Sequence, residues 1–128
     1  MSAAIGKSST ERTIMKHYLV EHWSYKSAWH ALSQQERTAF AARIGDAVEQ
    51  MASQGIRTLG FGRVDRALDM AHQGFDFWSI WEMESLEARD AFLAGVAATG
   101  WYDYFEHANT GGLLESPEKL IASHVLGQ

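Results

Sequence analysis

The sequence predicts an α+β fold with elements in the order β-α-β-β-α-β and one further helix at the C-terminus. Three observations favour this fold. Four short segments are rich in aromatic and β-branched residues, which is typical of strands. Two longer segments carry apolar residues at helical spacing, and each follows a serine suited to a helix N-cap. A glycine closes each of these helical segments.

The first strand is predicted at residues 16–25 and the first helix directly after Ser33. Ser33 and Glu36 form a capping box, because the glutamate stands three residues after the N-cap. The helix has an apolar stripe at Phe40, Ile44, Val48 and Met51. Gly55 ends it, since glycine tolerates a left-handed backbone.

The second and third strands are predicted at residues 57–64 and 75–83, with a polar connection between them. Gly60 and Gly62 fall on one face of the second strand. Two glycines on one face leave a smooth patch where a side chain, a ligand or another backbone can come close.

The second helix begins after Ser85, has Glu87 in its first turn, and ends at Gly100. The fourth strand is predicted at residues 102–110. A short last helix opens at Ser116-Pro117-Glu118, with proline at the favoured first position. This order of elements is the split βαβ, or ferredoxin-like, arrangement.

The composition fits one domain at residues 15–128, preceded by a flexible leader at residues 1–14. The leader lacks the apolar centre of a signal peptide, and no stretch approaches the roughly 20 apolar residues that span a bilayer. We therefore expect a cytoplasmic protein. The net charge of −5, without any basic run, argues against nucleic acid and membranes as partners.

The absence of cysteine excludes disulfides, thiolate metal sites and cysteine nucleophiles. His17 and His22 are five residues apart on one strand, so they point to opposite faces and cannot chelate one ion. We predict no metal site and no cofactor. Haem is kept as an alternative, because it needs only one histidine and an apolar slot.

Both faces of the predicted sheet are apolar. In the third strand Phe77 and Trp81 point one way, while Trp78 and Ile80 point the other. Two helices can cover only one face of a four-stranded sheet. A second copy packing sheet against sheet would cover the other face, so we predict a homodimer.

The strand order and the ending Gly-Trp-Tyr-Asp-Tyr-Phe-Glu-His at residues 100–107 resemble the dimeric α/β barrel superfamily, and specifically an uncharacterised stand-alone subgroup. The resemblance covers residues 16–112. It implies a barrel formed across the dimer, with pockets inside the barrel or between sheet and helices. Members include cofactor-free monooxygenases, polyketide cyclases, lactone isomerases, haem-binding peroxidase-like enzymes and proteins without known activity.

One departure from that superfamily weakens a monooxygenase assignment. Small monooxygenases of this kind often carry a histidine on the helix after the third strand. Residues 85–99 contain no histidine.

Residues 100–109 combine four aromatic rings with two carboxylates, an imidazole and a carboxamide. This mixture predicts a pocket wall, where rings hold a ligand while acids and bases act on it. The alternative is an amphipathic edge strand with a solvated polar face. In a strand, Glu106 and His107 point in opposite directions, so we expect at most one of them to face a given cavity.

We name His22, His107 and Glu106 as candidate catalytic residues. His107 needs a partner from another strand, and the first strand offers His17, Glu21 and His22. We expect the first and fourth strands not to be neighbours, so that these side chains meet across a cavity or a dimer. The candidate substrate-binding residues are Trp23, Tyr102, Tyr104, Trp81 and Arg63, and the guanidinium of Arg63 suits a carboxylate at the pocket rim.

The sequence thus predicts a small enzyme that performs acid–base chemistry on an apolar or aromatic organic substrate, of the isomerase, cyclase or cofactor-independent oxygenase type. One alternative is a non-catalytic homodimer that binds a small hydrophobic or aromatic ligand or serves a structural role. A haem-binding barrel protein is the other.

Overall fold

The computed structural model describes residues 15–128, so the leader expected at residues 1–14 lies outside the described residues. Four strands form one antiparallel sheet in the order β2-β3-β1-β4. They are β1 (His17–Tyr25), β2 (Ile56–Arg63), β3 (Phe77–Met83) and β4 (Phe105–Gly112). This is the ferredoxin-like arrangement, and the predicted fold class is confirmed.

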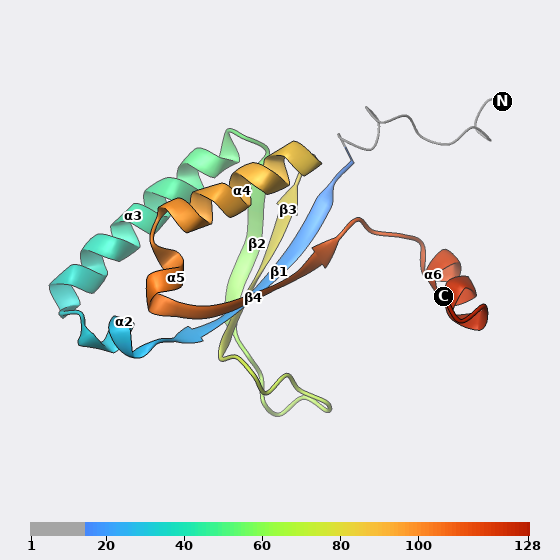
Figure 1. Ribbon diagram of the computed structural model, residues 1–128, viewed down its shortest axis with the longest axis horizontal. Helices are drawn as coiled ribbons and strands as arrows, with labels where there is room; N and C mark the ends of the chain where they lie inside the picture. The colour runs from blue at the N-terminus through green and yellow to red at the C-terminus, as the bar shows by residue number, and fades with distance from the viewer. Residues whose placement is uncertain (1–14) are drawn as a thin grey trace.

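The long helices α3 (Gln34–Ala52) and α4 (Leu86–Ala98) cover one face of the sheet (Figure 1). Two short helices, α2 (Ser27–Ala31) and α5 (Trp101–Tyr104), lie at one end of it. The last helix, α6 (Pro117–Val125), projects beyond the end of β4 and buries none of its residues (Figure 1). None of the helices in the described part of the chain has the length and apolarity needed to cross a membrane.

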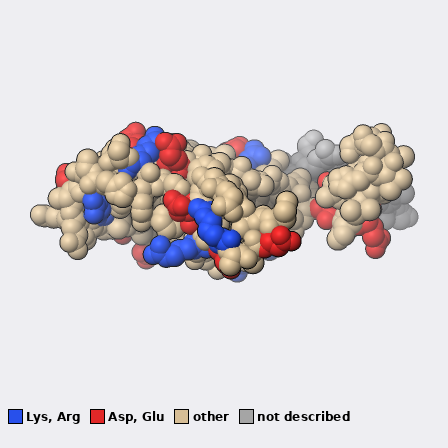
Figure 2. Space-filling view, turned by 90° about the horizontal axis from the view of Figure 1, so that it is seen from below, with Lys and Arg blue, Asp and Glu red and all other residues tan. Residues whose placement is uncertain are grey.

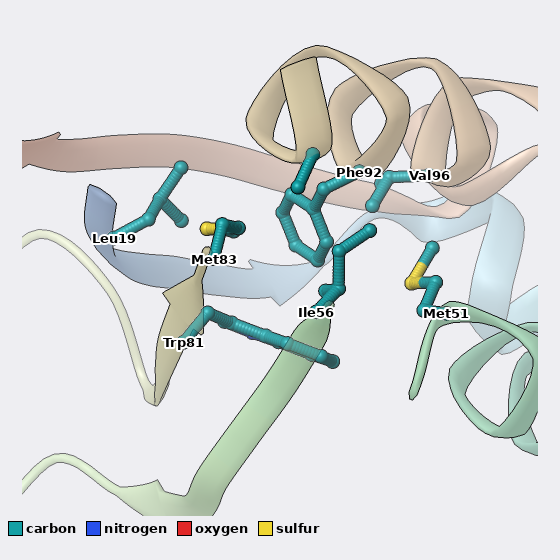
Figure 3. Close-up of a cluster of buried hydrophobic side chains, with 8 residues drawn as sticks. Leu19, Met51, Ile56, Trp81, Met83, Phe92 and Val96 are labelled. Carbon is teal, nitrogen blue, oxygen red and sulfur yellow. The ribbon is translucent and has the colours of Figure 1, made fainter. Parts of the chain in front are cut away.

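The main core lies between the sheet and the two long helices. Figure 3 shows apolar side chains of α4 and α3 meeting those of the three strands β1, β2 and β3. Ile56, Phe92 and Met83 are almost completely buried. Burying a side chain of this size stabilises the fold by roughly 1.5–3 kcal/mol, so the core fixes the helices against this face.

The predicted helix boundaries have the expected capping contacts. The Glu36 backbone N–H donates to Oγ of Ser33 at 3.1 Å, and the Ser33 N–H donates to Oε1 of Glu36 at 2.8 Å. Ser85 caps α4 in the same way, through the Ala88 N–H. Gly100, with φ of 86°, turns the chain after α4. The capping box predicted at Ser33 is therefore confirmed.

Two expectations about the fourth strand are wrong. The strand begins at Phe105 rather than residue 102, because Trp101–Tyr104 form the helical turn α5. Lys26 holds that turn: its Nζ donates to the Tyr102 carbonyl at 2.6 Å, and its backbone N–H donates to the Tyr104 carbonyl at 2.9 Å. The first and fourth strands are also direct neighbours, since β1 pairs with β4 along eight residue pairs.

A β-bulge between Thr58 and Gly60 decides where the aromatic side chain of β2 points. Gly60 adopts a φ of 147°, a conformation that favours glycine. After the bulge, Phe61 pairs with Ser79 and faces the helices. Gly62 lies on the opposite face beneath the Trp78 ring, whose Nε1 would be only 3.0 Å from an added Cβ.

The face of the sheet away from α3 and α4 keeps apolar side chains exposed in this chain. Trp78 is 36% exposed on it, whereas Trp81, on the helix-covered face, is 2% exposed. We call this surface the open face. Seen from below, the molecule mixes acidic and basic side chains without a continuous basic surface (Figure 2).

Candidate functional site

A buried carboxylate lies at the centre of the helix-covered face. Glu21 is 5% exposed, midway along β1 between the core residues Leu19 and Trp23. Its Oε1 accepts hydrogen bonds from Oγ of Ser79 at 2.9 Å and from Nε1 of Trp81 at 2.7 Å. Burial raises the pKa of Glu21, and the hydrogen bonds from Ser79 and Trp81 only partly oppose this effect. Glu21 is therefore suited to exchanging a proton at a higher pH than an ordinary glutamate.

The second carboxylate oxygen of Glu21 faces a histidine on the neighbouring strand. Nε2 of His107 lies 3.5 Å from Oε2 of Glu21, and both side chains are buried. The indole N–H of Trp101 donates to Nδ1 of His107 at 3.0 Å. An indole N–H can only donate, so Nδ1 carries no proton and Nε2 must carry it. Nε2 then donates to Oδ1 of Asn109 at 2.7 Å.

This assignment makes His107 a neutral imidazole in a single tautomer. Trp101 fixes one ring nitrogen, so the N–H of the other points toward Asn109 and Glu21. The contact with Glu21 is thus between a carboxylate and a neutral N–H group rather than between two opposite charges. An imidazole held in this way on the neighbouring strand β4 orients the Glu21 carboxylate without neutralising its charge.

A small cavity of about 30 Å³ lies between this face of the sheet and helices α3 and α4. Glu21 is its only ionisable lining residue, and Phe61, Trp81, Phe92 and Trp101 are among the apolar ones. The volume suffices for about two or three water molecules. Glu21 therefore presents the one charged group of an otherwise apolar chamber.

A belt of aromatic rings surrounds the Glu21–His107 pair. Trp101 stacks on Phe105 with ring centroids 4.1 Å apart, and it meets Trp23 edge-on at 5.5 Å. Trp23, Phe40 and Phe105 form a second buried cluster next to the main core. Such close rings keep water away from the pair and hold Trp101 in place for its bond to His107.

Some of the residues predicted for the site gather around Glu21. Trp81 bonds to it directly, and Trp23 is its neighbour but one on β1. The ring of Tyr102 lies 5.2 Å from that of His107. Burial, and then the charge of Glu21, raise the pKa of the Tyr102 phenol.

The other predicted residues lie elsewhere. His22 points to the open face, where its ring is 4.6 Å from that of His72, and burial lowers its pKa. Glu106 is exposed on the same open face. Tyr104 packs against Phe40, away from the cavity. Hence His22 and Glu106 do not share a chamber with His107.

Arg63 lies at the end of β2 on the helix-covered side, with its guanidinium 5.6 Å from the ring centre of Phe77. It borders a separate groove rather than the cavity that Glu21 lines.

Sequence reasoning gave Glu21 only as one of three possible partners for His107, and it did not identify Ser79 or Trp101 as polar contacts. The available signal was the alternation of β1, in which His17, Leu19, Glu21 and Trp23 share a face. A carboxylate in the middle of an apolar strand face must be paired or shifted in pKa.

The described residues include no group of three side chains able to hold a metal ion. Haem does not fit the cavity beside Glu21, which is far smaller than a macrocycle and has no histidine in its lining. Both ring nitrogens of His107 are already hydrogen-bonded, so neither is free to bind iron.

Comparisons with known proteins define the fold and leave the chemistry open. The family model described as "Family of unknown function (DUF6616)" matches residues 16–126. No curated protein matches the sequence.

Among solved structures, a mutant chlorite dismutase from Candidatus Nitrospira defluvii superposes with a TM-score of 0.62 at 16% sequence identity. The superposition covers 80% of this chain and 41% of the dismutase, so the chain spans less than half of that protein. At this identity the similarity establishes a shared fold alone.

Proposed function

This chain belongs to the family of unknown function DUF6616, and we propose that it is a small-molecule enzyme with Glu21 as its proton-transfer group. The substrate would be an apolar or aromatic organic molecule with an acidic C–H bond. Glu21 supports this proposal most directly, because it is the one ionisable side chain facing an apolar cavity. Carboxylates in such settings act as general bases and acids near neutral pH.

In this proposal the two oxygens of Glu21 have different roles. Oε1 is held by Ser79 and Trp81, which fix the carboxylate plane. Oε2 takes the proton from the substrate carbon, and the electron pair of the broken C–H bond moves into the substrate as an enolate. Glu21 then returns this proton, or one exchanged with solvent, to the carbanion. Return to the same carbon gives hydrogen exchange, and return to another carbon of the delocalised anion gives an isomer.

His107 is a positioning residue in this scheme. Its Nε2 lies 3.5 Å from Oε2 of Glu21, and Trp101 keeps it in the tautomer whose Nε2–H donates to Asn109 beside that oxygen. A neutral N–H beside the carboxylate stabilises the charged form without removing its basicity.

A non-catalytic role is the competing hypothesis. The hydrogen bonds of Glu21, Ser79 and Trp81 satisfy one another, as a purely structural buried network would. The two hypotheses differ in one respect. A structural network needs no acidic C–H substrate. The proposed enzyme must exchange the α-protons of a ligand whose acidic CH2 group reaches Glu21, while the rest of the molecule stays outside the cavity of about 30 Å³.

We also propose that the chain is a homodimer that packs open face against open face, as in a stand-alone dimeric α/β barrel. Leu59 is 61% exposed and Trp78 36% exposed in the single chain. Tyr18, Val20 and Ile80 add half-buried apolar side chains to this face. A second copy would remove all of this surface from water.

The test of the proton-transfer proposal uses phenylacetone, a neutral aromatic ketone with an acidic CH2 group, in heavy water. NMR measures the loss of the CH2 proton signals with wild-type protein and with the Glu21→Gln variant. We expect wild-type protein to speed the exchange and Glu21→Gln to lower that rate by at least about 100-fold. Glu49→Gln, an exposed α3 position, is the matched control. Equal exchange rates in wild type and Glu21→Gln would leave the structural role as the better account.

A further inference from the structure

An aromatic groove lies beside the Glu21 cavity, where β1 and β2 end and β3 begins. It has a volume of about 330 Å³ and is lined by Trp23, Tyr25, Phe61, Gly62, Arg63 and Phe77. Phe61 is 53% exposed and Tyr25 is 45% exposed, which is high for rings of this size. Phe61 lines both the groove and the cavity, so the two spaces share one wall residue.

Arg63 is the one cation in the lining of this groove. Within residues 15–128 its guanidinium makes no hydrogen bond and no ion pair, and it lies over the ring of Phe77. Every other arginine in that range donates to a protein oxygen: Arg37, Arg43, Arg57, Arg66 and Arg89. The donors of Arg63 are therefore free for an anion, and a guanidinium binds a carboxylate through two parallel hydrogen bonds.

Strand pairing relates Arg63 to Glu21. Two adjacent rows cross the helix-covered face of the sheet, the first made of Arg63, Phe77 and Trp23, and the second of Phe61, Ser79 and Glu21. Arg63 and Glu21 are thus two strands and two residues apart, which puts their Cα atoms about 12 Å from each other. A molecule with one ring and a short acidic side chain is long enough to reach from the Arg63 guanidinium toward the Glu21 carboxylate.

We propose that the groove binds a single-ring aromatic carboxylic acid, with its carboxylate on Arg63 and its ring among Trp23, Phe61 and Phe77. This inference rests on the proposed function, and it specifies the substrate class of the same site. Aromatic rings favour edge-on or offset contacts with other rings, and the groove offers such faces. In this proposal the half-exposed ring of Phe61, which lines both spaces, turns aside to open the way to Glu21.

The test measures binding alone, so that it does not depend on catalysis by Glu21. The probes are 3-phenylpropanoate and its neutral amide, which differ only in the charged end. Their dissociation constants are obtained by NMR titration of the tryptophan indole signals in wild type, Arg63→Gln and Arg57→Gln. Arg57 lies on the same strand and is paired with Glu82 on the surface, so its loss removes an equal charge away from the groove.

We expect wild-type protein to bind the acid at least about tenfold more tightly than the amide. Arg63→Gln should abolish this preference, and Arg57→Gln should keep it. The proposal is overturned if the wild type does not prefer the acid, if it binds neither probe at millimolar concentration, or if Arg63→Gln retains the preference.

The two proposals fail separately. If the Arg63 preference holds while Glu21→Gln leaves phenylacetone exchange unchanged, the groove binds aromatic acids and the catalytic proposal is wrong. If exchange depends on Glu21 but acid and amide bind alike, the enzyme proposal holds and the substrate class is wrong.

Discussion

Oε2 of Glu21 lies 3.5 Å from Nε2 of His107, across the antiparallel pairing of β1 and β4, and both side chains are buried. The relationship depends on a third residue, because the indole of Trp101 decides which nitrogen of His107 carries the proton. Glu21 in turn faces the cavity that His107 does not line. In this pair the Glu21 carboxylate lines the cavity, and the His107 imidazole contacts the carboxylate without lining the cavity itself.

Replacing Trp101 with phenylalanine should remove the preference of His107 for a single tautomer. The variant lacks the indole N–H, so Nδ1 can gain a proton and both tautomers become populated. The lost hydrogen bond should also cost about 1 kcal/mol of unfolding free energy. Nitrogen-15 NMR of the histidine rings reads the tautomer directly. Trp29→Phe, in the same aromatic belt, is the control, since Trp29 does not contact His107. An unchanged His107 spectrum in Trp101→Phe would show that the indole does not set the tautomer.

The stability of the protein should depend on pH through Glu21. Its pKa is raised in the folded state above the ordinary value of 4.5, so the folded protein binds this proton more readily than the unfolded chain. The stability that Glu21 contributes is therefore complete below about pH 4.5 and is lost as the pH rises through the folded-state pKa.

Urea denaturation of wild type and Glu21→Gln over a range of pH isolates this effect from that of the other carboxylates. The unfolding free energy of wild type minus that of the variant should fall as the pH rises from mildly acidic to neutral. A difference that stays constant, or that grows with pH, would mean that the pKa of Glu21 is not raised.

The capping box of α3 should contribute measurably to stability. Ser33→Ala removes the acceptor of the Glu36 N–H and should lower the unfolding free energy by about 1 kcal/mol. Ser116 caps α6 by the same contact, but α6 buries none of its residues. Ser116→Ala should therefore leave the denaturation midpoint nearly unchanged. Equal effects of the two substitutions would indicate that packing of α3 does not depend on its cap.

The proposed dimer should depend on Trp78. A charge introduced there by Trp78→Asp would be buried without a partner in a face-to-face dimer, at a cost of several kcal/mol. Light scattering at micromolar concentration should give a dimer mass for wild type and for Trp78→Phe, and a monomer mass for Trp78→Asp. A monomer mass for the wild type would rule out the homodimer.

The order of the elements could be predicted from local signals. Ser33, Ser85 and Pro117 each mark a helix start by chemistry that acts within one turn, and each start is confirmed. The start of β4 could not be predicted this way. The aromatic-rich residues 101–105 suit a strand or a helical turn, and the observed turn is hydrogen-bonded to Lys26, which is distant in the sequence.

The candidate site was less predictable than the fold, because it depends on which strands are neighbours. His107 could be chosen from its own segment, but its contact with Glu21 requires the β1–β4 pairing. The position of Phe61 on the helix-covered face requires a bulge that local sequence only hints at through Gly60. Long-range pairing, rather than residue type, determines these contacts.

The most direct test of Glu21 as the proton-transfer group compares two carboxylates on opposite faces of the sheet. Phenylacetone exchange in heavy water is measured by NMR for Glu21→Gln, which alters the helix-covered face, and for Glu106→Gln, which alters the open face. Circular dichroism and light scattering confirm that both variants fold and assemble like wild type. We predict that Glu21→Gln loses the catalysed exchange and that Glu106→Gln keeps it. Loss of exchange in Glu106→Gln with full exchange in Glu21→Gln would place the chemistry on the open face and contradict the assignment of proton transfer to Glu21.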